Sequence, residues 1–229
     1  MKTVKVLYIQ NKSPFSNDLW QNCLSQIPKD QQKKVNKFRF QKDKQASLLG
    51  KLLLKRVFNT FLTNTSLEDI QYTKYQKPYI DQDFTFNISH SRDYVVLAYS
   101  LNDMSLGIDI EEVNTKARLE DFYSILTLEE RNKVNVSNNP HQSFYDIWTL
   151  KEAVCKADGR GLNLPLTDIQ IREACAITQQ NKWFYKAIDV APSYKCHVTS
   201  NQVFEIVSTA VSIEELYEKS ILNKELIID

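Results

Sequence analysis

The segment that most constrains this chain is residues 107–111, which read GIDIE and alternate apolar and acidic residues. Side chains along a β-strand point to opposite faces in turn, so we expect Asp109 and Glu111 on the same face. Residues 148–156, WTLKEAVCK, have helical spacing instead, and Glu152 and Lys156 lie four apart on one helix face. If this strand and this helix pack together, three carboxylates and a lysine converge.

Such a cluster suits a divalent cation bound beside a phosphate. Mg²⁺ prefers oxygen ligands and is commonly held by carboxylates together with phosphate oxygens. The candidate metal ligands are Asp109, Glu111 and Glu152, and the candidate catalytic residues are Glu152 and Lys156. Each segment alone also has an ordinary explanation. The acidic strand face can simply be solvated, and the helical pair can be a surface ion pair of a few tenths of a kcal/mol.

Composition excludes several classes of function. The 229 residues include 29 basic and 28 acidic side chains, so no net field recruits nucleic acid or a membrane. We find no signal peptide and no apolar run long enough to span a bilayer. The cysteines are scattered, which is typical of reduced thiols, so we expect a soluble cytoplasmic protein. With only four glycines, the chain holds neither a Rossmann fingerprint nor a P-loop.

The order of predicted elements, helices followed by strands and then the same again, indicates an α+β fold of two similar halves. We place the halves at residues 1–104 and 105–229, with the acidic segments near the seam between them. Predicted helices cover residues 28–44, 43–61, 119–134, 144–157 and 212–222. Predicted strands cover residues 1–10, 70–74, 84–88, 94–100, 106–111, 169–172, 183–190, 195–199 and 203–211.

A polar cluster, NISHSR, occupies residues 87–92 between two predicted strands. Hydroxyls, an imidazole and turn amides can together donate hydrogen bonds to phosphate oxygens, which makes Ser89 and His90 candidate anion contacts. A serine hydrolase is disfavoured because neighbouring residues of an extended chain point to opposite sides. A hairpin turn with a surface histidine is the plain alternative.

Two basic features are further candidates for ligand contact. Pro78 restricts the backbone after Lys77 and can hold that lysine toward a ligand, although most surface lysines have none. The basic run within residues 29–44, which includes Lys34, is either the wet face of a helix or a site for phosphate or an acidic partner.

Taken in order, these motifs resemble the 4′-phosphopantetheinyl transferases of the Sfp-like branch. The resemblance spans about residues 29–172, and it is the ordered set, rather than any one motif, that is specific. It implies a monomer with two halves in a pseudo-twofold relation, each a helix with an antiparallel sheet. The motifs are QKP at 76–78, FNISHS at 86–91, GIDIE at 107–111, WTLKEAVCK at 148–156 and GRGL at 159–162.

The resemblance also implies a reaction. Coenzyme A would donate its phosphopantetheine arm to a serine of an apo acyl or peptidyl carrier protein, releasing adenosine 3′,5′-bisphosphate. Asp109, Glu111 and Glu152 would hold Mg²⁺ on the diphosphate, with Glu152 or a metal-bound water accepting the serine proton. The implied contacts to coenzyme A are Lys34, Lys77, Ser89, His90 and Lys156. Lys151 would either bind the pantetheine arm of coenzyme A or stabilise the site.

The chain departs from the family pattern at three positions that concern the nucleotide. Ala46 stands where many relatives have an arginine that reaches the 3′-phosphate, Gln31 replaces a basic residue, and Gln76 replaces a glycine. We expect weaker nucleotide binding rather than different chemistry. The candidates to compensate are Lys42, Lys44 and Lys51.

Carrier docking is expected at residues 113–126, which would offer a basic and apolar surface to an acidic helix. The residues of this surface are Lys116, Arg118, Leu119, Phe122 and Tyr123. Ordinary core packing of Leu119 and Phe122 is the alternative. Two rival functions are a different Mg²⁺ enzyme, such as a phosphohydrolase or nucleotidyl transferase, and a non-catalytic module that binds acidic proteins or nucleic acid. A nucleic-acid role is disfavoured by the balanced charge.

Overall fold

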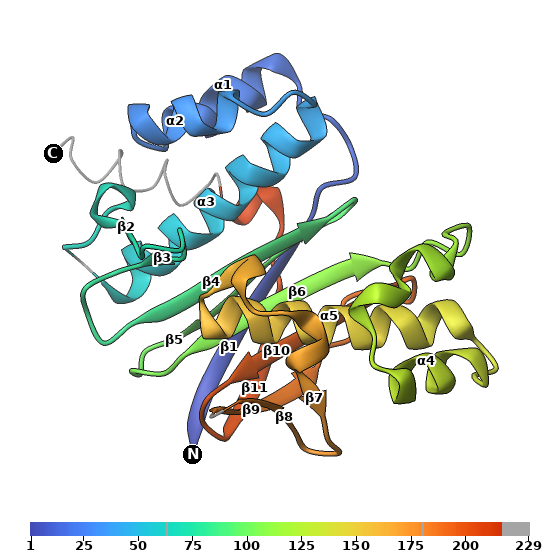
Figure 1. Ribbon diagram of the computed structural model, residues 1–229. Helices are drawn as coiled ribbons and strands as arrows, with labels where there is room; N and C mark the ends of the chain where they lie inside the picture. Colours follow the sequence, from blue (N-terminus) through green and yellow to red (C-terminus); the bar gives the residue numbers. More distant parts are fainter. Residues whose placement is uncertain (63, 180, 217–229) are drawn as a thin grey trace, which may run out of the picture.

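We describe a computed structural model of the protein that covers residues 1–62, 64–179 and 181–216 (Figure 1). The fold is α+β, as expected, and consists of two main sheets, each with a long helix against it. No helix in the described ranges combines the length and apolar character needed to cross a bilayer.

The helices are α1 (Asn17–Ser25), α2 (Lys29–Asn36), α3 (Gln41–Phe61), α4 (Leu128–Asn135) and α5 (Pro140–Asp158), with 3₁₀ turns η1 (Leu67–Asp69), η2 (Leu119–Ile125), η3 (Gly161–Asn163) and η4 (Leu166–Asp168). The strands are β1 (Lys2–Gln10), β2 (Gln71–Tyr72), β3 (Pro78–Tyr79), β4 (Thr85–Ser91), β5 (Tyr94–Ser100), β6 (Leu106–Glu112), β7 (Gln170–Ile171), β8 (Cys175–Thr178), β9 (Asn181–Ala187), β10 (Tyr194–Ser200) and β11 (Phe204–Ala210).

The first sheet has the order β11-β1-β5-β4. Its neighbours are antiparallel except for β11, which runs parallel to β1 from the pair Lys2–Phe204 to the pair Tyr8–Ala210. The strand β11 therefore belongs to the first sheet, although its residues fall within 105–229, the predicted C-terminal half.

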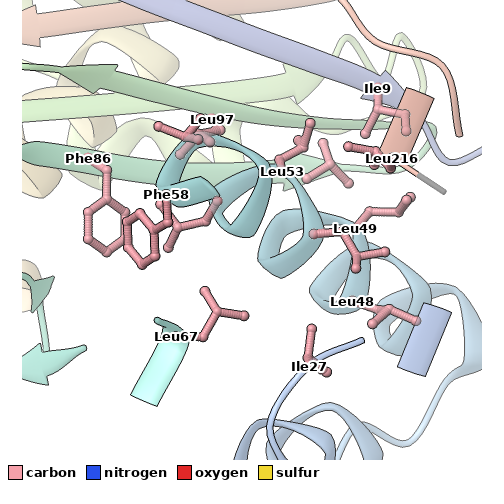
Figure 2. Packing of buried hydrophobic residues seen from close by; sticks show 14 of the residues in the cluster. Ile9, Ile27, Leu48, Leu49, Leu53, Phe58, Leu67, Phe86, Leu97 and Leu216 are labelled. Atoms are coloured by element: carbon pink, nitrogen blue, oxygen red, sulfur yellow. The ribbon is translucent and has the colours of Figure 1, made fainter. Parts of the chain in front are cut away.

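Helix α3 covers this sheet with a leucine-rich face (Figure 2). Leu53 points toward the sheet that carries Leu97, Phe58 packs against Phe86 of β4, and α1 and α2 lie along the other side of the helix. The buried amide of Gln45 has partners in the loop after β1, because its Nε2 donates to Asn11 Oδ1 and Ser13 O, both at 2.8 Å. Apolar burial is thus the main interaction that holds this helix in place.

The second sheet has the order β6-β10-β9-β8-β7 and is antiparallel throughout. Helix α5 starts after the N-cap Asn139 and ends at Gly159, whose φ of +84° favours glycine. It packs unusually close to β6, because a Cβ added at Gly107 would lie 2.1 Å from Ala153 O. The hydroxyl of Thr199 donates to the same carbonyl at 2.8 Å, which fixes the helix on the sheet.

The two sheets meet where β4, at the edge of the first, lies beside β6, at the edge of the second. Alternate residues of β4 reach across this seam. Asn87 Oδ1 accepts from Ile108 N at 2.9 Å, and Ser91 Oγ accepts from Glu112 N at 3.2 Å. Side chains therefore join the sheets here, and the polar face of β4 is turned toward the acidic face of β6.

Several predicted elements differ from the structure. The helix expected over residues 28–44 breaks into α2 and the start of α3, and the helix expected over 119–134 becomes η2 followed by α4. A new helix begins at α4 because Thr127 and Glu130 form a reciprocal capping box. Helix α1 and strand β8 were not predicted. The last predicted helix, 212–222, begins at 213 behind its Ser212 cap, and residues from 217 onward lie outside the described part.

Candidate active site

A cleft of about 370 Å³ opens at the seam between β4, β6 and α5. Six residues predicted from the sequence line it, which are Ser89, His90, Asp109, Glu111, Glu152 and Lys156. Ile88 and Trp148 complete its walls. The residues predicted from the strand pattern and those predicted from the helical pattern therefore line the same cleft.

Asp109 is at the centre of this cleft and is 4% exposed. Its Oδ1 accepts from Lys156 Nζ at 2.6 Å and from Ser89 Oγ at 2.9 Å, and the same ammonium donates to Ser89 Oγ at 2.8 Å. The other oxygen, Oδ2, is buried and has no hydrogen-bond partner among the described residues. A buried carboxylate oxygen without a partner is costly, and a cation is one group that would satisfy it.

The two neighbouring glutamates are desolvated carboxyls. Burial raises the pKa of Glu111 to about 7, aided by Asp109 and Glu152 and opposed by the Ser91 hydroxyl, which donates to Glu111 Oε2 at 2.7 Å, and by Lys156. Burial also raises the pKa of Glu152, with Asp109 adding to the shift and Lys156 opposing it. A divalent cation among these groups would favour their charged forms.

The donor set fits a hard cation in chemistry, although the carboxylates are not gathered around a common point. Among residues 1–62, 64–179 and 181–216, no three His, Cys, Asp or Glu side chains form a group ready to hold a metal ion. The Lys156 ammonium instead neutralises Asp109. Asp109, Glu111 and Glu152 therefore line one cleft, but a metal would need further oxygens, which a bound diphosphate carries.

His90 lies at the end of β4 and faces the cleft. Desolvation and the nearby Lys156 lower its pKa, while Asp43 and Asp109 oppose the shift. The imidazole is therefore neutral at physiological pH and can donate from one ring nitrogen to an anion.

Lys34, Lys77 and Lys151, all of them candidate coenzyme A contacts, lie outside the cleft, and the first two donate hydrogen bonds elsewhere. Lys34, on α2, donates to Tyr72 OH at 3.1 Å and lies over that ring. Lys77 donates to Ala157 O at 2.8 Å and to Leu106 O at 3.2 Å. Neither lysine lines the cleft around Asp109, so a contact with coenzyme A stays a prediction for both.

Of the two roles left open for Lys151, its position favours stabilising the site over binding coenzyme A. Its side chain is 0% exposed, and its amine donates to Glu130 Oε2 at 2.6 Å and to Ile125 O at 3.3 Å. A buried ammonium that already has these partners is not available to a ligand. Lys151 instead ties η2 and α4 to the helix that carries Glu152.

The departures from the family pattern have structural counterparts. Ala46 is buried in the first core, and Gln31 is buried with its Oε1 accepting from Lys51 Nζ at 3.0 Å. Gln76 adopts a φ of +66°, a conformation that favours glycine. Lys42 forms a salt bridge with Asp93. Of the lysines expected to compensate, Lys42 and Lys51 are thus already paired.

The sequence reasoning missed some of the residues that build the site. Asn87 and Ser91 face the seam with Ser89, and counting in twos from Ser89 would have found both. A second cavity of about 390 Å³ shares Glu152 and Lys156 with the cleft, and no local pattern signalled it. Its other walls are Ser124, Ile125, Cys155, Gly161, Leu164, Pro165, Leu166 and Thr167.

Comparison with known proteins agrees with this geometry. A family model described as "4'-phosphopantetheinyl transferase, N-terminal" matches residues 12–102, and one described as "4'-phosphopantetheinyl transferase superfamily" matches residues 105–207. The chain is 30% identical to the 4'-phosphopantetheinyl transferase gsp of Aneurinibacillus migulanus, over 93% of each chain. It is 28% identical to the 4'-phosphopantetheinyl transferase Sfp of Bacillus subtilis, over 93% of this chain and 100% of that protein. The protein belongs to the 4′-phosphopantetheinyl transferases.

Proposed function

We propose that this member of the family uses the seam cleft to transfer 4′-phosphopantetheine from coenzyme A to a serine hydroxyl of an apo acyl or peptidyl carrier protein, with Mg²⁺. The observation that carries the proposal is the hydrogen-bonded set of Asp109, Ser89 and Lys156, in which one buried oxygen of Asp109 has no partner among the described residues. This set joins an anionic and a cationic group at the junction of the two sheets. It is suited to a metal-bound diphosphate.

The transfer is a phosphoryl substitution. The serine oxygen bonds to the phosphorus that bears the pantetheine arm, and the bond from that phosphorus to the bridging oxygen breaks. The electron pair stays on the departing oxygen, which leaves as part of adenosine 3′,5′-bisphosphate. The hydroxyl proton passes to a base in the cleft.

The cleft residues divide these roles by charge. Asp109, Glu111 and Glu152 would hold Mg²⁺, which when bound neutralises charge on the diphosphate. The Lys156 side chain is 29% exposed, so its ammonium can turn from Asp109 to the departing oxygen. Glu152 is the candidate proton acceptor where it does not bind the cation, because a bound cation would remove the extra basicity that burial gives this carboxylate. Ser89 and His90 would donate hydrogen bonds to phosphate oxygens.

The carrier is proposed to dock on residues 113–126, beside the cleft. Phe122 is 37% exposed, and its ring lies 6.1 Å from that of Trp148, which lines the cleft. Leu119 is buried and belongs to the core, so Phe122 and Arg118 remain as docking candidates. We expect Phe122→Asp or Arg118→Glu to raise KM for the carrier but not for coenzyme A. Val207→Asp, at an apolar residue 53% exposed on β11, is the matched control.

The decisive experiment combines the protein, Mg²⁺, coenzyme A and several apo carriers, and weighs the carriers by mass spectrometry. We expect one carrier to gain a single phosphopantetheine, and we expect chelator or Glu152→Gln to abolish the gain. Glu112→Gln is the matched control. Glu112 is a glutamate on the same strand, β6, but its carboxylate lies near Arg92 and does not line the cleft. Nucleotide turnover without a carrier would instead indicate a hydrolase or nucleotidyl transferase.

The remaining parts of the proposal concern the state of the protein. We propose a cytoplasmic monomer that binds neither nucleic acid nor membrane, with its two halves divided at residues 104 and 105. Size-exclusion chromatography with light scattering tests the monomer, and a mass of two chains would contradict it.

A further inference from the structure

Lys77 lies in the turn between β2 and β3, in the N-terminal half, yet its amine contacts the C-terminal half. It donates to Ala157 O, in the last turn of α5, at 2.8 Å and to Leu106 O, at the start of β6, at 3.2 Å. One ammonium thus joins the strand that carries Asp109 to the helix that carries Lys156.

The two carbonyls make favourable partners for a cation. The last carbonyls of a helix lack partners within the helix, and positive charge at this end is stabilised by the helix dipole. Ala157 directly follows Lys156, and Leu106 precedes Asp109 by two intervening residues. The two hydrogen bonds from Lys77 therefore restrain the distance between Lys156 on α5 and Asp109 on β6.

The surroundings are shaped to admit the lysine. A Cβ added at Gly159 would lie 3.1 Å from Lys77 Cδ, so the bare glycine leaves room for the lysine stem. The backbone of Lys77 is anchored as well. Its carbonyl accepts from Thr73 N at 3.0 Å, and its N–H donates to Thr73 Oγ1 at 3.2 Å.

We propose that Lys77 is a positioning residue for phosphopantetheine transfer, which holds the C-terminal end of α5 at a fixed distance from β6 instead of touching coenzyme A. Desolvation lowers the pKa of this lysine to about 8, with Asp158 opposing the shift, which agrees with an amine turned inward. The expected effect on catalysis rests on the proposed function. The two hydrogen bonds from Lys77 to Ala157 and Leu106, which we call the clamp, are a property of the free enzyme.

The test is hydrogen exchange of the free enzyme together with steady-state kinetics. In Lys77→Met, we expect amides of residues 150–160 to exchange at least about tenfold faster, because two hydrogen bonds that restrain this end of α5 are lost. We expect kcat to fall roughly tenfold or more, with KM for coenzyme A changed less than about threefold, since misplacement acts on the chemical step. Lys77→Arg, which keeps the donor, should recover part of both.

The control is Lys34→Met, at a lysine that was also predicted to contact coenzyme A but lies on α2. It should leave exchange at residues 150–160 unchanged. If Lys77→Met also leaves that exchange unchanged and raises KM for coenzyme A, Lys77 is a ligand contact and the proposal is wrong. If Lys77→Met exchanges faster but the wild-type enzyme modifies no carrier, the clamp is supported and the proposed function is rejected.

A double-mutant cycle covers the case in which Lys77→Met folds poorly. Gly159→Ala crowds the lysine stem, whereas Gly161→Ala also places alanine at a positive φ but with nothing within 4 Å of its Cβ. We expect the effects of Lys77→Arg and Gly159→Ala on exchange to be non-additive, and those of Lys77→Arg and Gly161→Ala to add. Additivity in both pairs would overturn the proposal.

Discussion

The helices α3 and α5 each lie against a sheet, but different forces hold them there. The buried residues of α3 are apolar or glycine except for Gln45. Helix α5 is held at several points by directional bonds. Thr199 donates to Ala153 O, Lys77 donates to Ala157 O, and Lys151 pairs with Glu130.

A buried histidine adds a further tie to α5. The hydroxyl of Thr149 donates to Tyr145 O at 2.8 Å, so it accepts from Nδ1 of His197 at 2.9 Å. Burial lowers the pKa of His197, which keeps the ring neutral and fixes that proton on Nδ1. Apolar contacts tolerate small slides, whereas hydrogen bonds do not. The helix that carries the chemistry is the one fixed by hydrogen bonds.

The largest effect on activity is expected from Gly107→Ala. The added Cβ would lie 2.1 Å from the backbone carbonyl of Ala153, so α5 must move away from β6. We expect a loss of about 3 kcal/mol in the free energy of unfolding and a fall in kcat/KM of roughly 100-fold. Urea unfolding and carrier-modification kinetics measure these. Wild-type kinetics in this variant would refute the idea that the helix position matters.

The largest effect on stability alone is expected at the buried pair of Lys151 and Glu130. Lys151→Met leaves Glu130 buried without its cation, and we expect a loss of about 3–5 kcal/mol in the free energy of unfolding. Adding Glu130→Gln removes the stranded charge and should restore much of that loss. Urea unfolding of the single and double variants tests this. An equally unstable double variant would show that the pair is not the cause.

The pH dependence of stability should differ between Glu111, which lines the cleft, and Glu112, which does not. The pKa of Glu111 is raised in the folded state to about 7, so the folded protein binds more protons than the unfolded chain between about pH 4.5 and 7. Stability therefore falls as pH rises through this window. With chelator present, we expect Glu111→Gln to be more stable than wild type at pH 8 by about 1–3 kcal/mol. Glu112→Gln, measured in the same way, should show no such gain.

The smallest effect is expected from Gly50→Ala, the counterpart of Gly107→Ala in the first half. Its Cβ would meet only the Ile88 side chain, at 3.1 Å, and a side chain can give way. The crowding is offset by about 1 kcal/mol of helix propensity, so we expect stability within about 1 kcal/mol of wild type. Thermal or urea unfolding measures this. A loss as large as that of Gly107→Ala would remove the contrast between the helices.

Local pattern predicted the centre of the site well. Period two placed Asp109 and Glu111 together, and period 3.6 placed Glu152 with Lys156. The same helical period also excludes Lys151 from that face, because one residue turns an α-helix by about 100°. Its assignment to the ligand came from the family resemblance and neglected this rotation.

Other features had no local signal to read. The partners of Lys77 are 29 and 80 residues away, and nothing around the lysine indicates which carbonyls it meets. Contacts between distant segments are thus where reading the sequence alone fell short.

The parallel pairing of β11 with β1 bears on how the molecule forms during synthesis. The strand β1 is synthesised before its outer neighbour β11, which emerges only after the strands of the second sheet have been made. The nascent N-terminal half therefore waits with one flank of β1 open to foreign strands. Synthesis must pass β11 before that flank closes, and a fragment ending before β11 would leave it open permanently.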